Sequence, residues 1–175
     1  MSPDHRRLLL LRHAKAAAAP EVTDHDRPLA GRGHDEAPTA GRWMVEHGVV
    51  PDFILCSSAL RARQTTTWVC QELGEKAPTP QLRDDLYNAG TTGLLAVINH
   101  VPETVRTLLV VAHFPGVQNV ALRLASAESD QDAVTDLGTE YPTLGLTLLE
   151  HDLPWAELDR RDAAVTAFAV PRCVR

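Results

Sequence analysis

Residues 8–13 read Leu8-Leu9-Leu10-Leu11-Arg12-His13, and this stretch decides the fold. Four consecutive apolar residues indicate a strand that is buried on both faces of its sheet, and the charged pair marks the point where the strand emerges into solvent. A sheet buried on both faces is typical of parallel α/β structures, in which helices cover both sides. The stretch therefore predicts an α/β fold with Arg12 and His13 at one edge of its sheet.

The same pattern recurs twice further along the chain. Residues 108–112 form an apolar run that ends in His113, and residues 53–56 form another, with Arg61 a few residues beyond it. In open α/β sheets, ligands bind outside the carboxyl ends of the strands. Three buried strands are therefore expected to deliver two arginines and two histidines to one sheet edge.

Strands and helices alternate along the chain. We expect strands at about 7–12, 52–56 and 107–112, an extended segment at Leu82, and two late strands at about 144–150 and 163–170. We expect a helix that starts at about 32 or 34 and ends at 47, although Pro38 fits a first turn and favours a later start. Further helices are expected at about 59–73, 92–100 and 115–125, whereas 126–136 is expected to be a surface loop. This alternation predicts a three-layer α/β/α sandwich with a mostly parallel central sheet, to which the late strands add an antiparallel edge.

The composition limits the classes of protein to consider. Hydrophobic residues make up 44% of the chain and charged residues 23%, which is ordinary for one soluble globular domain spanning residues 1–175. Lys and Arg number 17 against 23 Asp and Glu, a formal net charge of −6, so nucleic acid is not expected as a partner. Apolar runs fall far short of the ~20 residues of a spanning helix, so no membrane role is expected.

Cysteine usage points to a reducing compartment. Cys56, Cys70 and Cys173 are odd in number and form no CxxC pair. That pattern argues against a disulfide framework or a zinc ribbon. We therefore expect a cytoplasmic protein.

His13 is the candidate nucleophile. An unprotonated imidazole attacks phosphorus and forms a phosphohistidine, which divides one difficult displacement into two easier ones. Arg12 and Arg61 are the candidate phosphate clamp, because guanidinium groups donate paired, charge-assisted hydrogen bonds to phosphate oxygens. Arg63 competes with Arg61, but the two point to different sides of a helix. His113 is the candidate second imidazole that donates to the phosphoryl group.

The acid that protonates the leaving group has two candidates. Asp84 and Asp85 lie in what is expected to be a loop. A carboxyl group there acts as a general acid if partial burial raises its pKa. The alternative, given equal weight, is an ordinary acidic turn.

These residues resemble the histidine phosphatase superfamily, whose signature is an Arg-His pair after the first strand, and within it the SixA-type phosphohistidine phosphatases. Four segments carry the resemblance in the family's order: LLLLRHAKA at 8–16, DRPL at 26–29 with GRG at 31–33, SSALRARQT at 57–65, and AHFPG at 112–116. The resemblance implies a fold of the phosphoglycerate-mutase type, a phosphorylated His13, and a phosphate pocket completed by Arg12, Arg61 and His113, with no metal or other cofactor. Phe114 replaces the family's Asn, which implies an aromatic side chain at the rim.

The chain is short for this superfamily, which leaves little room for a domain that caps the site. An open site suits a phosphoryl group displayed on a protein and offers few contacts to a small molecule. The first hypothesis is therefore hydrolysis of phosphohistidine, or of another exposed phosphoryl group, on a protein partner. The alternatives are a phosphatase for small phosphomonoesters and an inactive phosphate-binding module. Arg27 is either a substrate-binding residue at the rim or a structural residue of its turn.

Overall fold

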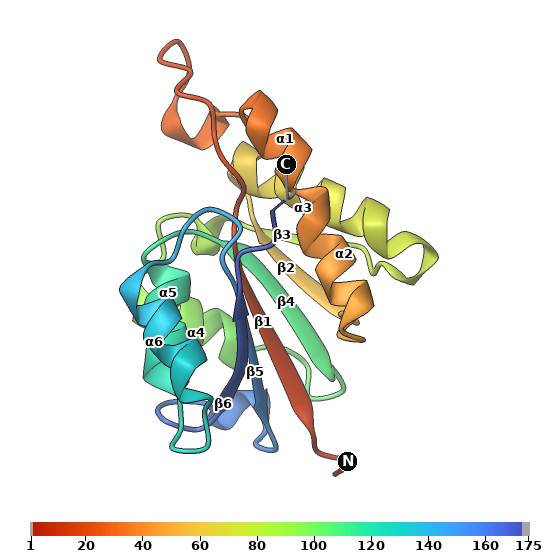
Figure 1. Cartoon of the computed structure of the whole chain (residues 1–175), viewed down its shortest axis with the longest axis vertical. Helices are drawn as coiled ribbons and strands as arrows, with labels where there is room; N and C mark the ends of the chain where they lie inside the picture. Colours follow the sequence, from red (N-terminus) through yellow and green to blue (C-terminus); the bar gives the residue numbers. More distant parts are fainter. Residues whose placement is uncertain (1, 173–175) are drawn as a thin grey trace.

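The computed structural model describes residues 2–172, which are built around one mixed sheet of six strands (Figure 1). The strands lie side by side in the order β3-β2-β4-β1-β5-β6. Their bounds are Arg6–Arg12 (β1), Phe53–Ser57 (β2), Gln81–Arg83 (β3), Thr107–Ala112 (β4), Leu146–His151 (β5) and Ala164–Ala169 (β6). β1 to β4 run parallel to one another, and β5 and β6 extend the sheet in antiparallel fashion. The predicted mostly parallel sheet with an antiparallel edge is confirmed.

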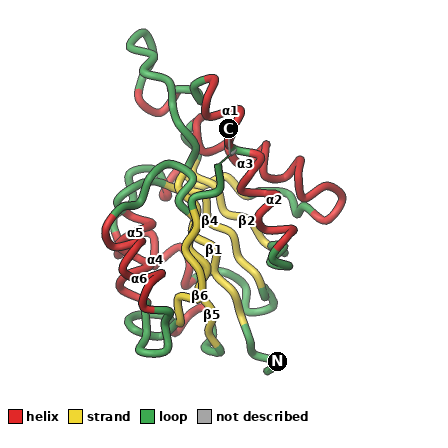
Figure 2. Tube along the Cα trace, viewed as in Figure 1, coloured by secondary structure: helices red, strands yellow, loops and turns green. Residues whose placement is uncertain are grey.

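Two helical layers cover the sheet (Figure 2). One layer holds α1 (Gly31–Glu36), α2 (Pro38–Glu46) and α3 (Leu60–Leu73), and the other holds α4 (Thr91–Asn99), α5 (Gly116–Leu124) and α6 (Gln131–Thr139). Short 3-10 turns lie at Asp24–Asp26 (η1), Gly74–Lys76 (η2), Asp84–Leu86 (η3) and Trp155–Glu157 (η4). The predicted three-layer α/β/α sandwich is confirmed.

The central strand β1 accounts for the run of four leucines. Leu8 and Leu10 pack into the core on the side of α4, α5 and α6. Leu9 and Leu11 pack into the core on the side of α1, α2 and α3. All four are fully buried. Because successive side chains of a strand point to opposite faces, an unbroken apolar run is what a strand between two helical layers requires.

The pairing of β1 with β4 places the first two site residues. Its parallel register sets Arg12 opposite Ala112. The next residues, His13 and His113, therefore leave the sheet side by side at its carboxyl edge.

The single helix predicted over residues 32–47 is wrong. The segment forms two helices, α1 and α2, which meet at Ala37. Pro38 begins α2 because proline lacks the N–H that a helix interior needs and is tolerated in a first turn.

The surface loop predicted over residues 126–136 is wrong in its second half. α6 begins at Gln131, after the Asp130 side chain accepts a hydrogen bond from the backbone N–H of Ala133 at 2.8 Å. Leu137 is the one buried residue of α6. The apolar stripe of the helix is short, with Ala133 and Val134 packing partly buried beside Leu137 within an otherwise polar segment.

Two further expectations concern cysteines and membranes. Cys56 and Cys70 are free thiols, and Cys173 lies outside the described residues. Within residues 2–172, no helix combines the length and the apolar character that crossing a membrane demands.

Gly33 lets α1 pack onto the segment that follows His13. A Cβ added at this position would lie 2.2 Å from the carbonyl oxygen of Lys15. That oxygen also accepts a hydrogen bond from the N–H of Ala30 at 2.9 Å. Since the obstructing atom belongs to the backbone, no side-chain movement relieves the clash.

We expect Gly33→Ala to lower the free energy of unfolding by about 1–3 kcal/mol, the usual cost of forcing extra volume into a packed site. Gly31→Ala is the matched control, because a Cβ at Gly31 meets nothing within 4 Å. It should leave stability within about 0.5 kcal/mol of the parent. Urea unfolding of the three proteins measures the difference, and equal losses in both variants would show that the Lys15 contact is unimportant.

Candidate active site

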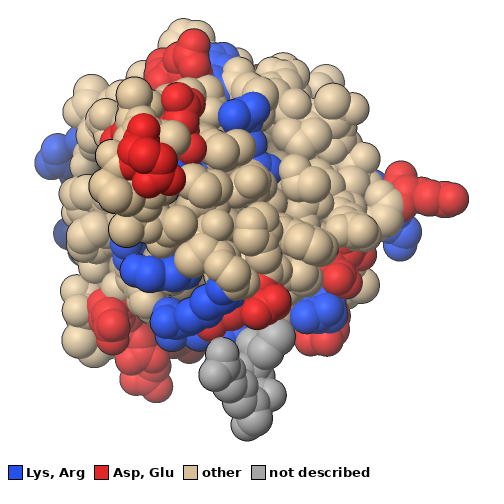
Figure 3. Space-filling model, turned by 90° about the horizontal axis from the view of Figure 1, so that it is seen from above, with Lys and Arg blue, Asp and Glu red and all other residues tan. Residues whose placement is uncertain are grey.

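The candidate site lies at the carboxyl edge of the parallel strands, the upper end of the molecule in Figure 1. Seen from above, acidic and basic side chains lie close together on this face (Figure 3). The four residues of the predicted phosphate pocket come from three places: the ends of β1 and β4, and the first turn of α3. The arrangement follows the general rule for ligand sites in open α/β sheets.

His13 is buried, and its two ring nitrogens have different partners. Nδ1 lies 2.7 Å from the carbonyl oxygen of Ala14. A carbonyl oxygen only accepts, so Nδ1 carries the proton and donates it, and Nε2 keeps its lone pair. The Nε–H of Arg61 donates to this Nε2 at 3.3 Å. Burial, reinforced by the nearby His113 and arginines, lowers the pKa of His13 to about 3, so the ring is neutral near pH 7.

His113 is the neighbouring imidazole, with its ring centroid 5.2 Å from that of His13. Its Nε2 lies 2.7 Å from Oγ of the buried Ser57. Ser57 Oγ also accepts from the N–H of Ala59 at 3.3 Å, so Ser57 anchors the His113 ring to the start of α3. Burial, followed by the charges of Arg61 and Arg12, lowers the pKa of His113 to about 4.

Arg61 faces the site and Arg63 faces solvent, as their spacing on a helix predicts. The backbone carbonyl of Arg61 accepts from the hydroxyl of Thr65 at 2.8 Å. The same hydroxyl oxygen accepts from the N–H of Ala14 at 3.0 Å. Thr65 thereby ties α3 to the residue after His13 and fixes Arg61 beside the imidazole.

Arg12, the last residue of β1, is half-buried and near enough to both imidazoles for its charge to act on them. Its Nη1 donates to the carbonyl of Tyr141 at 2.7 Å. Its guanidinium lies over the ring of Phe114, 5.0 Å from the ring centroid. Phe114 is 48% exposed, so the site carries an aromatic rim, and burial lowers the pKa of Arg12.

Asp24 is a site residue that sequence reasoning missed. It lies in the loop after β1 that rises above the body of the molecule (Figure 1). Its Oδ2 accepts from the Tyr87 hydroxyl at 2.6 Å and from Arg61 Nη2 at 3.1 Å, and its backbone carbonyl accepts from Arg61 Nη1 at 2.7 Å. The hydrogen bonds from Tyr87 and then Arg27 hold the pKa of Asp24 well below its usual range. The available signal was an acidic residue three positions before Arg27.

Arg27 braces the loop that carries Asp24. Its Nε donates to the carbonyl of Ala17 at 3.0 Å, and its Nη1 donates to Asp24 Oδ1 at 2.9 Å. These contacts lie within the loop and give Arg27 a structural role there. Direct contact with a substrate stays a prediction.

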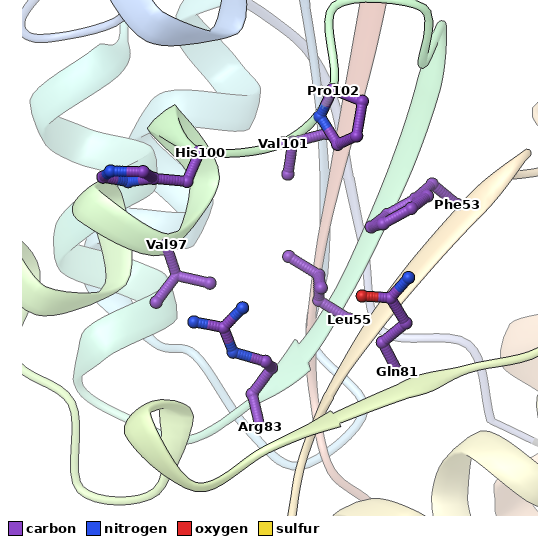
Figure 4. Close-up of a pocket in the computed structure, with 8 residues that line it drawn as sticks. All are labelled: Phe53, Leu55, Gln81, Arg83, Val97, His100, Val101 and Pro102. Carbon is purple, nitrogen blue, oxygen red and sulfur yellow. The ribbon is translucent and has the colours of Figure 1, made fainter.

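The two candidate acids, Asp84 and Asp85, lie in η3, and within residues 2–172 they make no hydrogen bond to either site histidine. Arg83 holds Asp85 through two hydrogen bonds of 2.9 and 2.5 Å, and these lower the pKa of Asp85. Arg83 also lines a pocket of about 240 Å³ between β2, β3 and α4, which shares no residue with the His13 centre (Figure 4). In the described part of the chain, no hydrogen bond or ion pair joins Asp84 or Asp85 to His13 or His113. An acid role for either carboxyl stays a prediction.

Residues 8–90 match the family described as "Histidine phosphatase superfamily (branch 1)". A solved structure from Nakamurella multipartitia, provisionally described as the phosphohistidine phosphatase SixA, superposes with a TM-score of 0.84 at 31% identity, covering 95% of this chain and 96% of that one. The chain belongs to the histidine phosphatase superfamily. Membership in this superfamily supports phosphatase activity toward a phosphorylated substrate.

Two sequence relatives extend the comparison. An uncharacterized protein of Mycobacterium tuberculosis is 39% identical over 163 residues, which cover 93% of this chain and all of that protein. The phosphohistidine phosphatase SixA of Escherichia coli is 28% identical over 127 residues, which cover 70% of this chain and 76% of that protein.

We expect the free energy of unfolding to fall as the pH drops from about 6.5 toward about 4. An unfolded histidine takes up its proton near pH 6.5. Folded His13 and His113 stay neutral until the pH approaches about 3 and about 4, so acid favours the unfolded chain. Each contributes at most about 1.4 kcal/mol per pH unit, and none of it above about pH 6.5.

Urea unfolding at several pH values measures this dependence. The slope should be shallower in His13→Asn, which lacks one of three histidines whose pKa is lowered by burial; the third is His151, whose pKa burial lowers to about 4. An unfolding free energy that stays level between about pH 6.5 and about pH 5 would contradict the buried, neutral state of these rings.

Proposed function

We propose that the protein is a phosphatase that uses His13 as its nucleophile and acts on phosphohistidine displayed by a protein partner. The observation that carries the proposal is which nitrogen of the His13 ring donates a hydrogen bond and which accepts one. Nδ1 donates to Ala14, which leaves the Nε2 lone pair beside the Nε–H of Arg61. A buried, neutral imidazole of this kind needs no base to activate it.

In the first step, Nε2 of His13 attacks phosphorus, and a P–N bond forms as the bond to the leaving group breaks. The ring becomes positively charged, and the Ala14 carbonyl, already accepting from Nδ1, stabilises that charge. Arg12, Arg61 and His113, which lie near His13, stabilise the charge on the phosphoryl oxygens. In the second step, water attacks the phosphorus, phosphate leaves, and His13 returns as a neutral imidazole.

The surroundings of the site support a protein substrate. Two residues separate β2 from α3, and three separate β4 from α5. Neither of these two connections inserts a domain above His13. The longer connection from β1 to α1 carries Asp24, and Phe114 and Asp24 are exposed at the rim. A phosphorylated side chain on the surface of another protein has access to such a site. The name of the Escherichia coli relative, a phosphohistidine phosphatase, points the same way.

His13→Ala should abolish turnover, because the covalent route is lost; a fall of about a thousandfold or more is expected. The assay is phosphate release from a histidine-phosphorylated peptide, run with a chelator beside a panel of small phosphomonoesters. Parent protein stopped by acid-free denaturation during turnover should carry phosphate on His13. Turnover that survives in His13→Ala would overturn the nucleophile, and preference for a small ester would overturn the substrate.

Arg61→Ala should lower the turnover rate by about a hundred- to a thousandfold, the usual cost of removing a donor that meets charge in the transition state. Arg63→Ala is the matched control, because Arg63 lies two residues away on the same helix and faces solvent. It should behave as the parent does. Similar losses in both variants would mean that the net charge of α3, and not the placement of Arg61, sets the rate.

A further inference from the structure

The Asp24 carboxylate lies on the guanidinium that the proposed mechanism assigns to phosphate. Arg61 donates from Nε to His13 Nε2 at 3.3 Å and from Nη2 to Asp24 Oδ2 at 3.1 Å. The nucleophilic nitrogen and the carboxylate are therefore separated by the width of one guanidinium. A permanent negative charge here offsets part of the positive charge of Arg61 and repels a phosphate dianion. A pocket that bound phosphate alone would bind it more tightly without this carboxylate.

The chemistry of the leaving group gives this carboxylate a use. When phosphoryl transfer runs between two imidazoles, the ring that departs must keep a proton on its far nitrogen, because it then leaves as a neutral molecule. His13 meets this condition when it is the leaving group, since Nδ1–H donates to the Ala14 carbonyl. The ring of a substrate phosphohistidine needs an acceptor of the same kind on the opposite side of the phosphorus.

We propose that Asp24 is a specificity-determining residue whose carboxylate accepts a hydrogen bond from the far ring N–H of a phosphohistidine substrate, which selects phosphoramidates over phosphate esters. This inference rests on the proposed function. The P–N bond to His13 forms, the P–N bond to the substrate breaks, and its electron pair returns to the substrate nitrogen. The far nitrogen keeps its proton throughout, so no acid takes part. An ester oxygen has no such proton to donate to Asp24.

The contacts of Asp24 leave room for this hydrogen bond. Oδ2 already accepts from Tyr87 and Arg61, whereas Oδ1 accepts from Arg27 at 2.9 Å. A carboxylate oxygen accepts two hydrogen bonds, so Oδ1 has capacity for another donor. The side chain is 51% exposed, which gives an incoming ring access to it.

The charged and titratable groups around Asp24 keep it ionised. Arg27 comes from its own loop, Arg61 from α3, and Tyr87 from the segment after η3, with His113 of the β4 end also within electrostatic range. His25, next in the chain, packs its ring against the edge of Tyr87 at 4.8 Å between centroids. In this setting Asp24 is an acceptor and a poor proton donor. Asp24 therefore favours a substrate whose leaving group already carries an N–H that can donate to it.

Asp24→Asn tests the proposal with two substrates: a histidine-phosphorylated peptide and 4-nitrophenyl phosphate, whose leaving group departs as a stable anion. We expect kcat/KM on the peptide to fall about ten- to a hundredfold, the worth of a hydrogen bond to a charged group. Activity on the ester should not fall but rise, because Asn removes the charge that repels the phosphate dianion and offsets Arg61. The alkaline limb of the peptide pH profile should move to lower pH, because the substrate ring loses the carboxylate that keeps it protonated.

Asp26→Asn is the matched control. Asp26 belongs to the same turn and contacts Thr23 and His25 of that turn. It should match the parent on both substrates. Equal losses on both substrates in Asp24→Asn, or equal effects of the two variants, would overturn the proposal and leave Asp24 a support for Arg61. A parent protein that hydrolyses the ester and not the peptide would overturn the proposed function, and the role of Asp24 with it.

Discussion

The parallel pairing of β1 with β4 is the constraint on which the rest of the structure depends. Leucines on both faces of β1 are buried, so the strand is stable only between two helical layers. Its register with β4 sets Arg12 opposite Ala112, and two histidines consequently leave the sheet together. A slip of one residue would exchange the two faces of the strand and separate the imidazoles. The core and the site are thus specified by the same hydrogen bonds.

The next constraint is the attachment of α3 to the chain that leaves β1. Thr65 binds the N–H of Ala14, and the Gln64 side chain accepts from the N–H of Leu29 at 2.7 Å. Gly33 adds the close approach of α1 to Lys15. These contacts hold both ends of the loop that carries Asp24. The side chains of Gln64 and Thr65 on α3 thus satisfy backbone N–H groups of the neighbouring loop, because a buried N–H without a partner would be costly.

The features that could be predicted from the sequence are those that depend on strong local patterns of residues. Apolar runs that end in charged residues located the strands and, with them, His13 and His113; helical spacing separated Arg61 from Arg63. Asp24 and Tyr87 lie in segments without periodicity, and only tertiary structure brings them together. The division between α1 and α2 escaped because the apolar pattern continues across Pro38. α6 escaped because its apolar face is limited to Ala133, Val134 and Leu137, and the cap at Asp130 was not recognised.

The hydrogen-bond acceptor for the His13 ring and the one proposed for the substrate ring belong to different kinds of structure, and this difference bears on substrate specificity. The acceptor for the His13 ring is a backbone carbonyl next to a central strand, so no side-chain substitution removes it. The acceptor proposed for the substrate ring is a carboxylate on an exposed loop. Such loops change with little cost to the fold, because few core contacts depend on them. In the proposed mechanism, phosphoryl transfer to His13 therefore depends on the sheet. The choice of leaving group depends on a loop that Arg27 braces and that can differ among proteins of the same architecture.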